Sequence, residues 1–284
     1  MVKSLQKLYR NSMRRHRFGY ALYEPALFEH LRPGMVGYMD EYQRWHPIVD
    51  LTDTAAVEAG EYSPVGYLQP NGPDSRHWGP LAASNVVESS VELEAGVGAT
   101  TLGLPIGVSG ILKYGTTGGF GALLMCDGEV ISEGFDFRNP FIVWLKRNAK
   151  VLFKRYPDLR KHGIYVATWT YSSENVHINV WGNGDHNVTV GFKVDVPQTV
   201  QAGPSTSWFR GRASSGWSAW TGQKRVVFFT GVKIKTCVLG IREQHEPAWR
   251  GSGQSFVVEG EEEGDDYEVD IQLVGDDWYD IGDI

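Results

Sequence analysis

A long apolar stretch rich in glycine, from Ala95 to Cys126, constrains the fold of this chain more than any other feature. It carries a single formal charge, on Lys113. The stretch is long and apolar enough for a bilayer, but its many glycines and Pro105 disfavour a helix. Taken alone, it predicts a buried pair of strands with a glycine-rich crossing.

The composition is that of a globular protein kept in a reducing compartment. The 284 residues are 42% hydrophobic and 12% aromatic, which is enough to bury a core. Cys126 and Cys237 have no metal-ligand spacing and are expected as free thiols. The first residues contain no apolar signal core, so we expect a cytoplasmic protein.

The net charge of −7 conceals two oppositely charged ends. Residues 1–17 contain six Lys or Arg and no acid, whereas residues 259–284 contain twelve Asp or Glu and no base. We therefore expect one domain over residues 1–250 and an acidic C-terminal tail over residues 251–284. Such a tail is either solvated or held against basic helices of the domain.

The basic N-terminal segment has the periodicity of an amphipathic helix. One predicted face carries Lys3, Lys7, Arg10, Arg14 and Arg17, and another carries Val2, Leu5, Tyr9 and Met13. Such a helix fits an anionic lipid surface, a solvated protein surface or nucleic acid. The nearly neutral middle of the chain favours lipid over nucleic acid.

A second basic amphipathic helix is predicted from Pro140 to Tyr156, with Asn139 as its N-cap and Pro157 as its stop. Its apolar face consists of Phe141, Ile142, Leu145, Ala149, Leu152, Phe153 and Tyr156. Its neighbouring face carries Lys146, Arg147, Lys150 and Lys154.

Residues 163–197 show the clearest strand pattern in the chain. They predict three alternating strands, Ile164–Tyr171, Asn175–Trp181 and Asn187–Val196, with turns at 172–174 and 182–185. A half-buried antiparallel strand and a membrane hairpin share this alternation, so the pattern leaves both possibilities open.

The remaining segments are predicted from their aromatic residues and from the residues, such as proline, that interrupt helices and strands. Residues 18–80 contain many prolines, so we expect only short strands such as Met35–Met39, with Asn71–Ser75 as a loop. Residues 203–223 are expected as a loop whose aromatic residues stack on sugars, lie at a membrane interface or fold onto the core, namely Trp208, Phe209, Trp217 and Trp220. Residues 224–242 predict one strand, or two that meet near residue 231.

No catalytic or metal-binding motif is recognisable in the sequence. The eight histidines are scattered, there is no phosphate-binding loop or nucleophile elbow, and paired acids are plentiful only in the tail. We therefore expect no enzyme activity, no cofactor and no metal.

The order of these segments resembles the pore-forming N-terminal domain of the gasdermin family. The resemblance rests on five elements in a fixed order. A basic first helix is followed by the strand pair SVELEAGVGATTLGLPIGVSG, and a basic second helix is followed by the strand segment GIYVATWTYSSENVHINVW and by the final strand block KRVVFFTGVKIKTCVLGI. Ser90–Leu93 and Gly163–Thr168 are the segments most similar to gasdermins, and the likeness covers residues 1–245. It is strongest to the single-domain gasdermin-like regulators of cell death of filamentous fungi.

The resemblance implies an α+β fold, a twisted, mostly antiparallel sheet flanked by amphipathic basic helices, able to refold into a membrane β-barrel. It implies a protein that binds acidic phospholipids, assembles into a ring oligomer and permeabilises the plasma membrane. The result would be allorecognition-type cell death, as in heterokaryon incompatibility, triggered by a sequence-divergent variant of the same protein. A barrel must close, because an open strand edge leaves backbone groups unpaired in hydrocarbon.

The resemblance also assigns roles to residues. Lipid contact is expected from Lys3, Lys7, Arg10, Arg14, Arg15, Arg17, Lys146, Arg147, Lys150 and Lys154. Two inserting hairpins are expected, one over about Val86–Cys126 and one over about Tyr165–Val196. Their inserting residues would be Leu104, Ile106, Val108, Ile111, Leu123, Val166, Ile178, Val180, Val188, Val190 and Phe192.

Two features qualify the expected function. Vertebrate gasdermins carry a C-terminal repressor domain, whereas the acidic tail is too short for one, so cleavage is not the expected trigger. Pro105 cannot donate within a strand ladder and is expected at a bend or an edge. The alternative is a cytosolic lectin-like or other ligand-binding β protein that uses the Trp208–Trp220 loop, and nucleic acid is not an expected partner.

Overall fold

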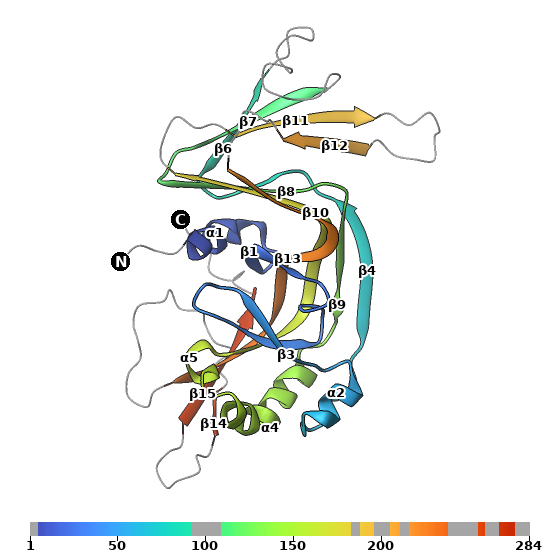
Figure 1. Cartoon of the computed structure of the whole chain (residues 1–284), viewed down its shortest axis with the longest axis vertical. Coiled ribbons are helices and arrows are strands. Elements are labelled where there is room, and N and C mark those ends of the chain that lie inside the picture. The colour runs from blue at the N-terminus through green and yellow to red at the C-terminus, as the bar shows by residue number, and fades with distance from the viewer. Residues whose placement is uncertain are drawn as a thin grey trace, which may run out of the picture. The chain divides into compact units, whose positions relative to one another are not determined.

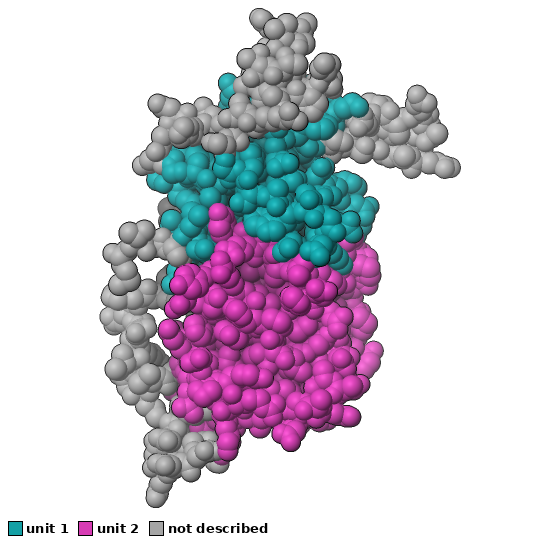
Figure 2. All heavy atoms as spheres, in the orientation of Figure 1, with its two compact units in different colours: residues 1–16, 75–130, 173–225 teal, residues 17–74, 131–172, 226–284 magenta. Residues whose placement is uncertain are grey.

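The computed structural model describes residues 5–91, 109–182, 188–195, 205–210, 216–237, 255–258 and 267–275 (Figure 1). Its elements are mostly antiparallel strands with a few helices, so the expected α+β class is confirmed. The chain divides into two compact units (Figure 2). Unit 1 contains residues 1–16, 75–130 and 173–225, and unit 2 contains residues 17–74, 131–172 and 226–284.

Unit 2 is built on a sheet with the strand order β14-β15-β13-β10-β2-β3. The strands are β14 (Ser255–Val258), β15 (Tyr267–Val274), β13 (Trp217–Cys237), β10 (Ile164–Gly182), β2 (Met35–Met39) and β3 (Trp45–Asp50). In addition, β1 (Tyr20–Leu27) pairs with β13, and β9 (Glu129–Phe135) pairs with β10 and with β4 (Pro70–His77). The strands β9, β10 and β13 each contribute residues to both units.

Among its described residues, unit 2 has three helices, namely α2 (Thr54–Ala59), α4 (Asn139–Arg155) and α5 (Leu159–His162). The longest, α4, buries Phe141, Leu145 and Leu152 in one apolar cluster with Val166 of β10 and Ile234 of β13. These helix residues recur at helical spacing, which is why a single face can enter the core.

The N-terminus of α4 differs from the prediction by one position. Arg138 is the N-cap residue, without a side-chain capping bond, and Asn139 is the first helical residue. Pro140 lies in the first turn, where its missing N–H costs no intrahelical bond. At the other end the C-cap is Tyr156, followed by the predicted stop at Pro157.

Unit 1 contains α1 (Leu5–Met13), the short 3₁₀ turn η1 (Arg14–His16) and two groups of strands. In the first group, β8 (Phe120–Cys126) pairs with residues 176–182 of β10 and with β5 (Leu81–Ala82). The second group is a four-stranded sheet in the described part of the chain, with the order β12-β11-β7-β6. Its strands are β12 (Ser205–Arg210), β11 (Val188–Asp195), β7 (Gly110–Thr116) and β6 (Val86–Val91).

The predicted turn at residues 172–174 is wrong, because β10 runs through it as one strand of 19 residues. Ser172 and Ser173 are buried, and Ser172 is in register with Ile131 of β9. The Ser172 hydroxyl also donates to the Ile131 carbonyl oxygen at 3.4 Å. A continuous ladder therefore satisfies the backbone where the polar residues alone had predicted a reversal.

The second predicted hairpin pairs differently from the prediction, and the first is formed in part. β11 pairs with β7 and β12, whereas β10 pairs with β8. β6 pairs with β7, but β8, which continues the first predicted hairpin, belongs to the other group of strands. Alternation fixes which face of a strand is apolar, but it does not fix which strand becomes the partner.

Three segments expected to be loops or a tail contain strands. Residues 71–75 lie in β4, whose eight residues are all exposed. Exposure and pairing with β9 explain how this strand tolerates two prolines. Trp208 lies in β12, and Trp217 and Trp220 lie in β13, so these aromatics are half-buried strand residues. Within the expected acidic tail, β14 and β15 pair with each other, and β15 pairs with β13.

Two tryptophan rings lie over glycines on neighbouring strands. Trp169 of β10 is in register with Gly134 of β9, and Trp181 of β10 is in register with Gly121 of β8. A Cβ at Gly134 would overlap the Trp169 ring and the Thr168 carbonyl oxygen, and one at Gly121 would overlap the Trp181 ring. Glycine is therefore required for close packing at both positions.

We expect the substitution Gly134→Ala to destabilise the protein by about 1–3 kcal/mol, because the added methyl group overpacks this contact. Thermal unfolding followed by circular dichroism measures the effect. Gly66→Ala is the matched control, since the nearest neighbour of its Cβ would be Pro140 at 3.9 Å. Equal melting temperatures for the two variants would contradict the packing explanation.

Candidate functional site

The exposed face of α4 carries four cations, as the sequence predicted. Lys146, Arg147, Lys150 and Lys154 are all exposed. On the opposite face, Phe141, Leu145, Leu152 and Phe153 have no exposed surface. The helix is therefore attached to unit 2 by its apolar side and presents its charges to solvent.

Polar contacts hold α4 against the chain that precedes β4. The Asn148 side-chain oxygen accepts a hydrogen bond from the Ser63 N–H at 2.8 Å, and its amide donates to the Trp144 carbonyl oxygen at 2.8 Å. The Trp144 ring N–H donates to the Ser63 carbonyl oxygen at 2.7 Å. These buried bonds fix the rotation of the helix, and with it the direction of the basic face.

Residues at the end of α4 add an ion pair and apolar surface. Arg155 pairs with Glu61 at 3.1 Å, donates to the Gly60 carbonyl oxygen at 2.8 Å and lies over the Tyr62 ring. Val151 and Tyr156 are 36% and 39% exposed. Cations beside exposed apolar side chains are the combination that suits a membrane interface.

Strand β14 lies beside α4, with the Lys146 ammonium 6.0 Å from the centre of the Phe256 ring. In the sequence, β14 is followed directly by the acidic run 259–266. That run lies outside the described residues.

The first basic helix is shorter than predicted. α1 ends at Met13, a 3₁₀ turn follows, and Arg17 has a φ of 62°, so the helix does not continue to residue 17. The five predicted cations therefore do not share one helical face. Lys7 and Arg15 are exposed, Arg10 and Arg14 are half-buried, Arg17 is exposed in unit 2, and Lys3 lies outside the described residues.

Contacts within unit 1 explain why α1 ends early. Tyr9 and Met13 are fully buried, as the predicted apolar face requires. The His16 Nε2 atom lies 2.7 Å from the Ala82 carbonyl oxygen, and the Ser84 N–H donates to the Ser12 carbonyl oxygen at 3.0 Å. These bonds to the segment before β6 replace the next helical turn.

Most residues predicted to insert into a membrane are buried in this structure. Ile111, Leu123, Val166, Ile178, Val188 and Val190 are buried, and Val180 and Phe192 are half-buried. Leu104, Ile106 and Val108 lie outside the described residues. In the four-stranded sheet, the Phe192 ring packs over Gly110 and lies 5.7 Å from the Trp208 ring.

The described part of the chain contains no group of three or more His, Cys, Asp or Glu that could hold a metal ion. Within the same residues, no helix has both the length and the apolarity that a membrane span requires.

Burial of His16 makes the stability of unit 1 dependent on pH. The pKa of His16 is lowered from 6.5 mainly because burial disfavours its charged form, and neighbouring Arg15 lowers it further, against the opposing effect of the bond to Ala82. At pH values between 6.5 and the lower pKa that His16 has in the folded chain, His16 binds a proton in the unfolded chain but not in the folded chain. Stability is therefore complete above pH 6.5 and falls as the pH decreases below it.

We expect the melting temperature of the wild type to fall between pH 7 and pH 5. The melting temperature of the His16→Gln variant should fall less steeply over the same range. The measurement is a series of thermal unfolding curves across this range. His30→Gln is the control, because His30 is exposed on the surface. An identical pH slope for His16→Gln and the wild type would refute the role of His16.

Comparisons with known proteins give a likeness to solved structures and none to a family model or a curated sequence. No protein-family model matches the chain, and no curated protein matches it significantly in sequence. Among solved structures, the chain is similar to the gasdermin A3 membrane pore determined by cryo-EM. The identity is 11%, over 84% of this chain and 93% of that chain, and the TM-score is 0.24. A score this low does not establish a shared fold, so the α+β class rests on the elements of this chain itself.

Proposed function

We propose that this chain binds membranes containing acidic phospholipids, assembles into an oligomer and permeabilises the membrane by inserting strands. The observation that carries the proposal is the face of α4 with its four exposed cations, Lys146, Arg147, Lys150 and Lys154, opposite a fully buried apolar face. Each Lys or Arg near an anionic membrane contributes about 1 kcal/mol of attraction.

The sequence resemblance to gasdermins supports the pore-forming part of the proposal. By that resemblance, the chain would be cytoplasmic before activation, act at the plasma membrane and cause regulated cell death. A fungal origin, activation by a sequence-divergent variant of the same chain, and a function without enzyme activity belong to the same proposal.

Insertion requires strands that can leave their present partners. In this proposal, β6, β7 and β11 of the four-stranded sheet supply inserting segments, because they lie within the two segments assigned to insertion. Ile111, Val188 and Val190 are buried in the described state and would exchange protein contacts for lipid. Neighbouring subunits must then pair edge to edge, because hydrocarbon cannot hydrogen-bond to a strand edge.

We expect the double substitution Arg147→Gln with Lys150→Gln to weaken binding to acidic vesicles roughly 30-fold, because two charges are lost at about 1 kcal/mol each. Co-sedimentation with vesicles of phosphatidylcholine and phosphatidylserine measures the binding. Arg160→Gln with Lys161→Gln is the matched control, since both side chains are exposed on α5. Equal binding by the two double variants would contradict the role of α4.

A charge on the exposed face of β6 tests the insertion step. Aspartate at the buried Ile111 or Leu123 would disturb the folded chain, but Val87 is 54% exposed and tolerates a charge there. We expect Val87→Asp to retain vesicle binding and to reduce dye leakage strongly, because a charge on the lipid face of a strand is unfavourable in a bilayer. The control is Val257→Asp, at a residue of β14 that is 64% exposed. Undiminished leakage for Val87→Asp would exclude β6 from the inserting segments.

A further inference from the structure

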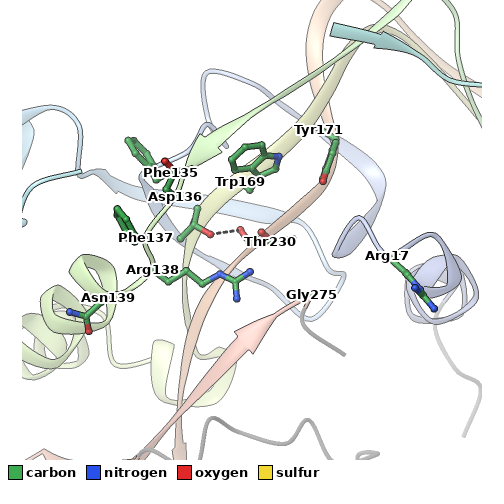
Figure 3. A pocket seen from close by; sticks show the side chains of 11 residues that line it. Arg17, Phe135, Asp136, Phe137, Arg138, Asn139, Trp169, Tyr171, Thr230 and Gly275 are labelled. Carbon is green, nitrogen blue, oxygen red and sulfur yellow. Dashed lines mark hydrogen bonds between the residues drawn. The ribbon is translucent and has the colours of Figure 1, made fainter. Parts of the chain in front are cut away.

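Two exposed aromatic side chains lie at the start of α4. Tyr67 is 82% exposed and Phe137 is 59% exposed. Phe137 immediately precedes the N-cap residue Arg138 (Figure 3). Tyr67 follows Gly66, where an added Cβ would lie 3.9 Å from the Cβ of Pro140 in the first turn of the helix. Segments far apart in sequence therefore bring two exposed rings to one end of α4.

The segment that carries Tyr67 is held along α4. Its Ser63 N–H donates to the Asn148 side-chain oxygen at 2.8 Å, and Gly66 lies against Pro140. Because residue numbers rise along the segment while they fall along the helix, the segment runs antiparallel to α4. Contacts spread over about two turns of the helix therefore fix the position of Tyr67.

Packing directs the Tyr67 ring outward. Val65 and Leu68, on either side of it, are partly buried and pack against the apolar cluster that contains the core face of α4. The Gln69 carbonyl oxygen accepts a hydrogen bond from the Asp136 N–H at 3.2 Å, which ties the segment to the chain just before α4. The exposure of Tyr67 is therefore built into a segment that is fixed on both sides of the ring.

The start of α4 is in line with its basic face. Pro140, Arg147 and Lys154 are spaced by seven residues, which is close to two helical turns, so they lie along one line of the helix. Val151, which follows Arg147 by four residues, is 36% exposed. The helix rises about 21 Å from Pro140 to Lys154. The surface that begins at the two rings is thus extended along the helix axis.

Neither face of α4 can enter a bilayer by itself. Its apolar residues Phe141, Leu145 and Leu152 are buried in the core, and its opposite face carries cations. A helix at a membrane interface combines attraction of its charges to anionic lipids with burial of apolar side chains. The exposed rings beside α4 can supply this apolar part, because aromatic side chains favour the headgroup region of a membrane.

We propose that Tyr67 and Phe137 anchor the basic face of α4 in an acidic membrane, by entering the boundary between headgroups and acyl chains while the helix lies parallel to the membrane plane. This inference rests on the proposed function and adds to it a part of the binding that salt does not screen. The exposed cations Lys146, Arg147 and Lys150 favour an anionic lipid surface as the occupant. A layer of headgroups admits the rings at any position, whereas a protein partner needs a pocket for each.

The test compares binding and insertion of the full chain at two salt concentrations. Co-sedimentation with vesicles of phosphatidylcholine and phosphatidylserine is measured at about 0.1 M salt and at about 1 M salt, where the Debye length is about 3 Å. Insertion is measured as the rise in surface pressure of a monolayer of the same lipids. The variants are Tyr67→Ser with Phe137→Ser, Tyr67→Trp, and the control Tyr42→Ser, at a tyrosine that is 56% exposed between β2 and β3. Melting curves establish that each variant is folded.

We expect the double serine variant to bind about tenfold more weakly than the wild type at both salt concentrations, because two rings no longer leave water. It should also raise the surface pressure of the monolayer less. Tyr67→Trp and Tyr42→Ser should behave like the wild type. Arg147→Gln with Lys150→Gln should lose binding mainly at the lower salt concentration, since only the attraction between charges is screened.

Failure of the anchor and failure of the proposed function give different results. If the wild type does not bind acidic vesicles at the lower salt concentration, the proposed function is wrong and the anchor with it. If the wild type binds, and the folded double serine variant binds and inserts equally well, only the anchor is wrong. Loss of all wild-type binding at the higher salt concentration, or an equal loss of insertion in Tyr42→Ser, would also overturn the anchor.

Discussion

Backbone pairing along β10 is the interaction on which both units depend. In unit 2 this strand pairs with β2 through Tyr165 and Val166, and with β9 over residues 169–172. In unit 1 it pairs with β8 over residues 176–182. Both faces of β10 are largely buried, so an unpaired backbone group along it would lack water as a substitute partner. This requirement explains why the strand remains extended through two serines that would otherwise favour a turn.

The sequence predicts local features of this chain better than its long-range partners. The apolar face of α4 is readable because Phe141, Leu145 and Leu152 recur at helical spacing, and the stop at Pro157 is a local steric effect. The pairing of β11 with β7 depends on residues far apart in sequence and cannot be derived from alternation. The early end of α1 likewise depends on the contact of His16 with Ala82, for which the helical periodicity contains no signal.

The sequence predicts a site well where the site depends on local periodicity and poorly where it depends on long-range pairing. The cations of α4 follow from periodicity, since a helix that buries one face must expose the other. A pocket in unit 2 (Figure 3) is lined by Phe135, Trp169 and Thr230, which the pairing of β9, β10 and β13 brings to one surface. Nothing in the spacing of these residues indicates that they share a surface. Asn148 was also missed, although a polar residue within an apolar helical face was a usable signal for a buried hydrogen bond.

The two faces of α4 respond differently to salt. The exposed cations act on anions through water, and at physiological ionic strength this attraction is screened over a Debye length of about 8 Å. The opposite face packs Phe141, Leu145 and Leu152 into an apolar cluster, and this contact does not depend on charge. Raising the salt concentration therefore weakens the attraction of the basic face and leaves the attachment of the helix to unit 2 in place.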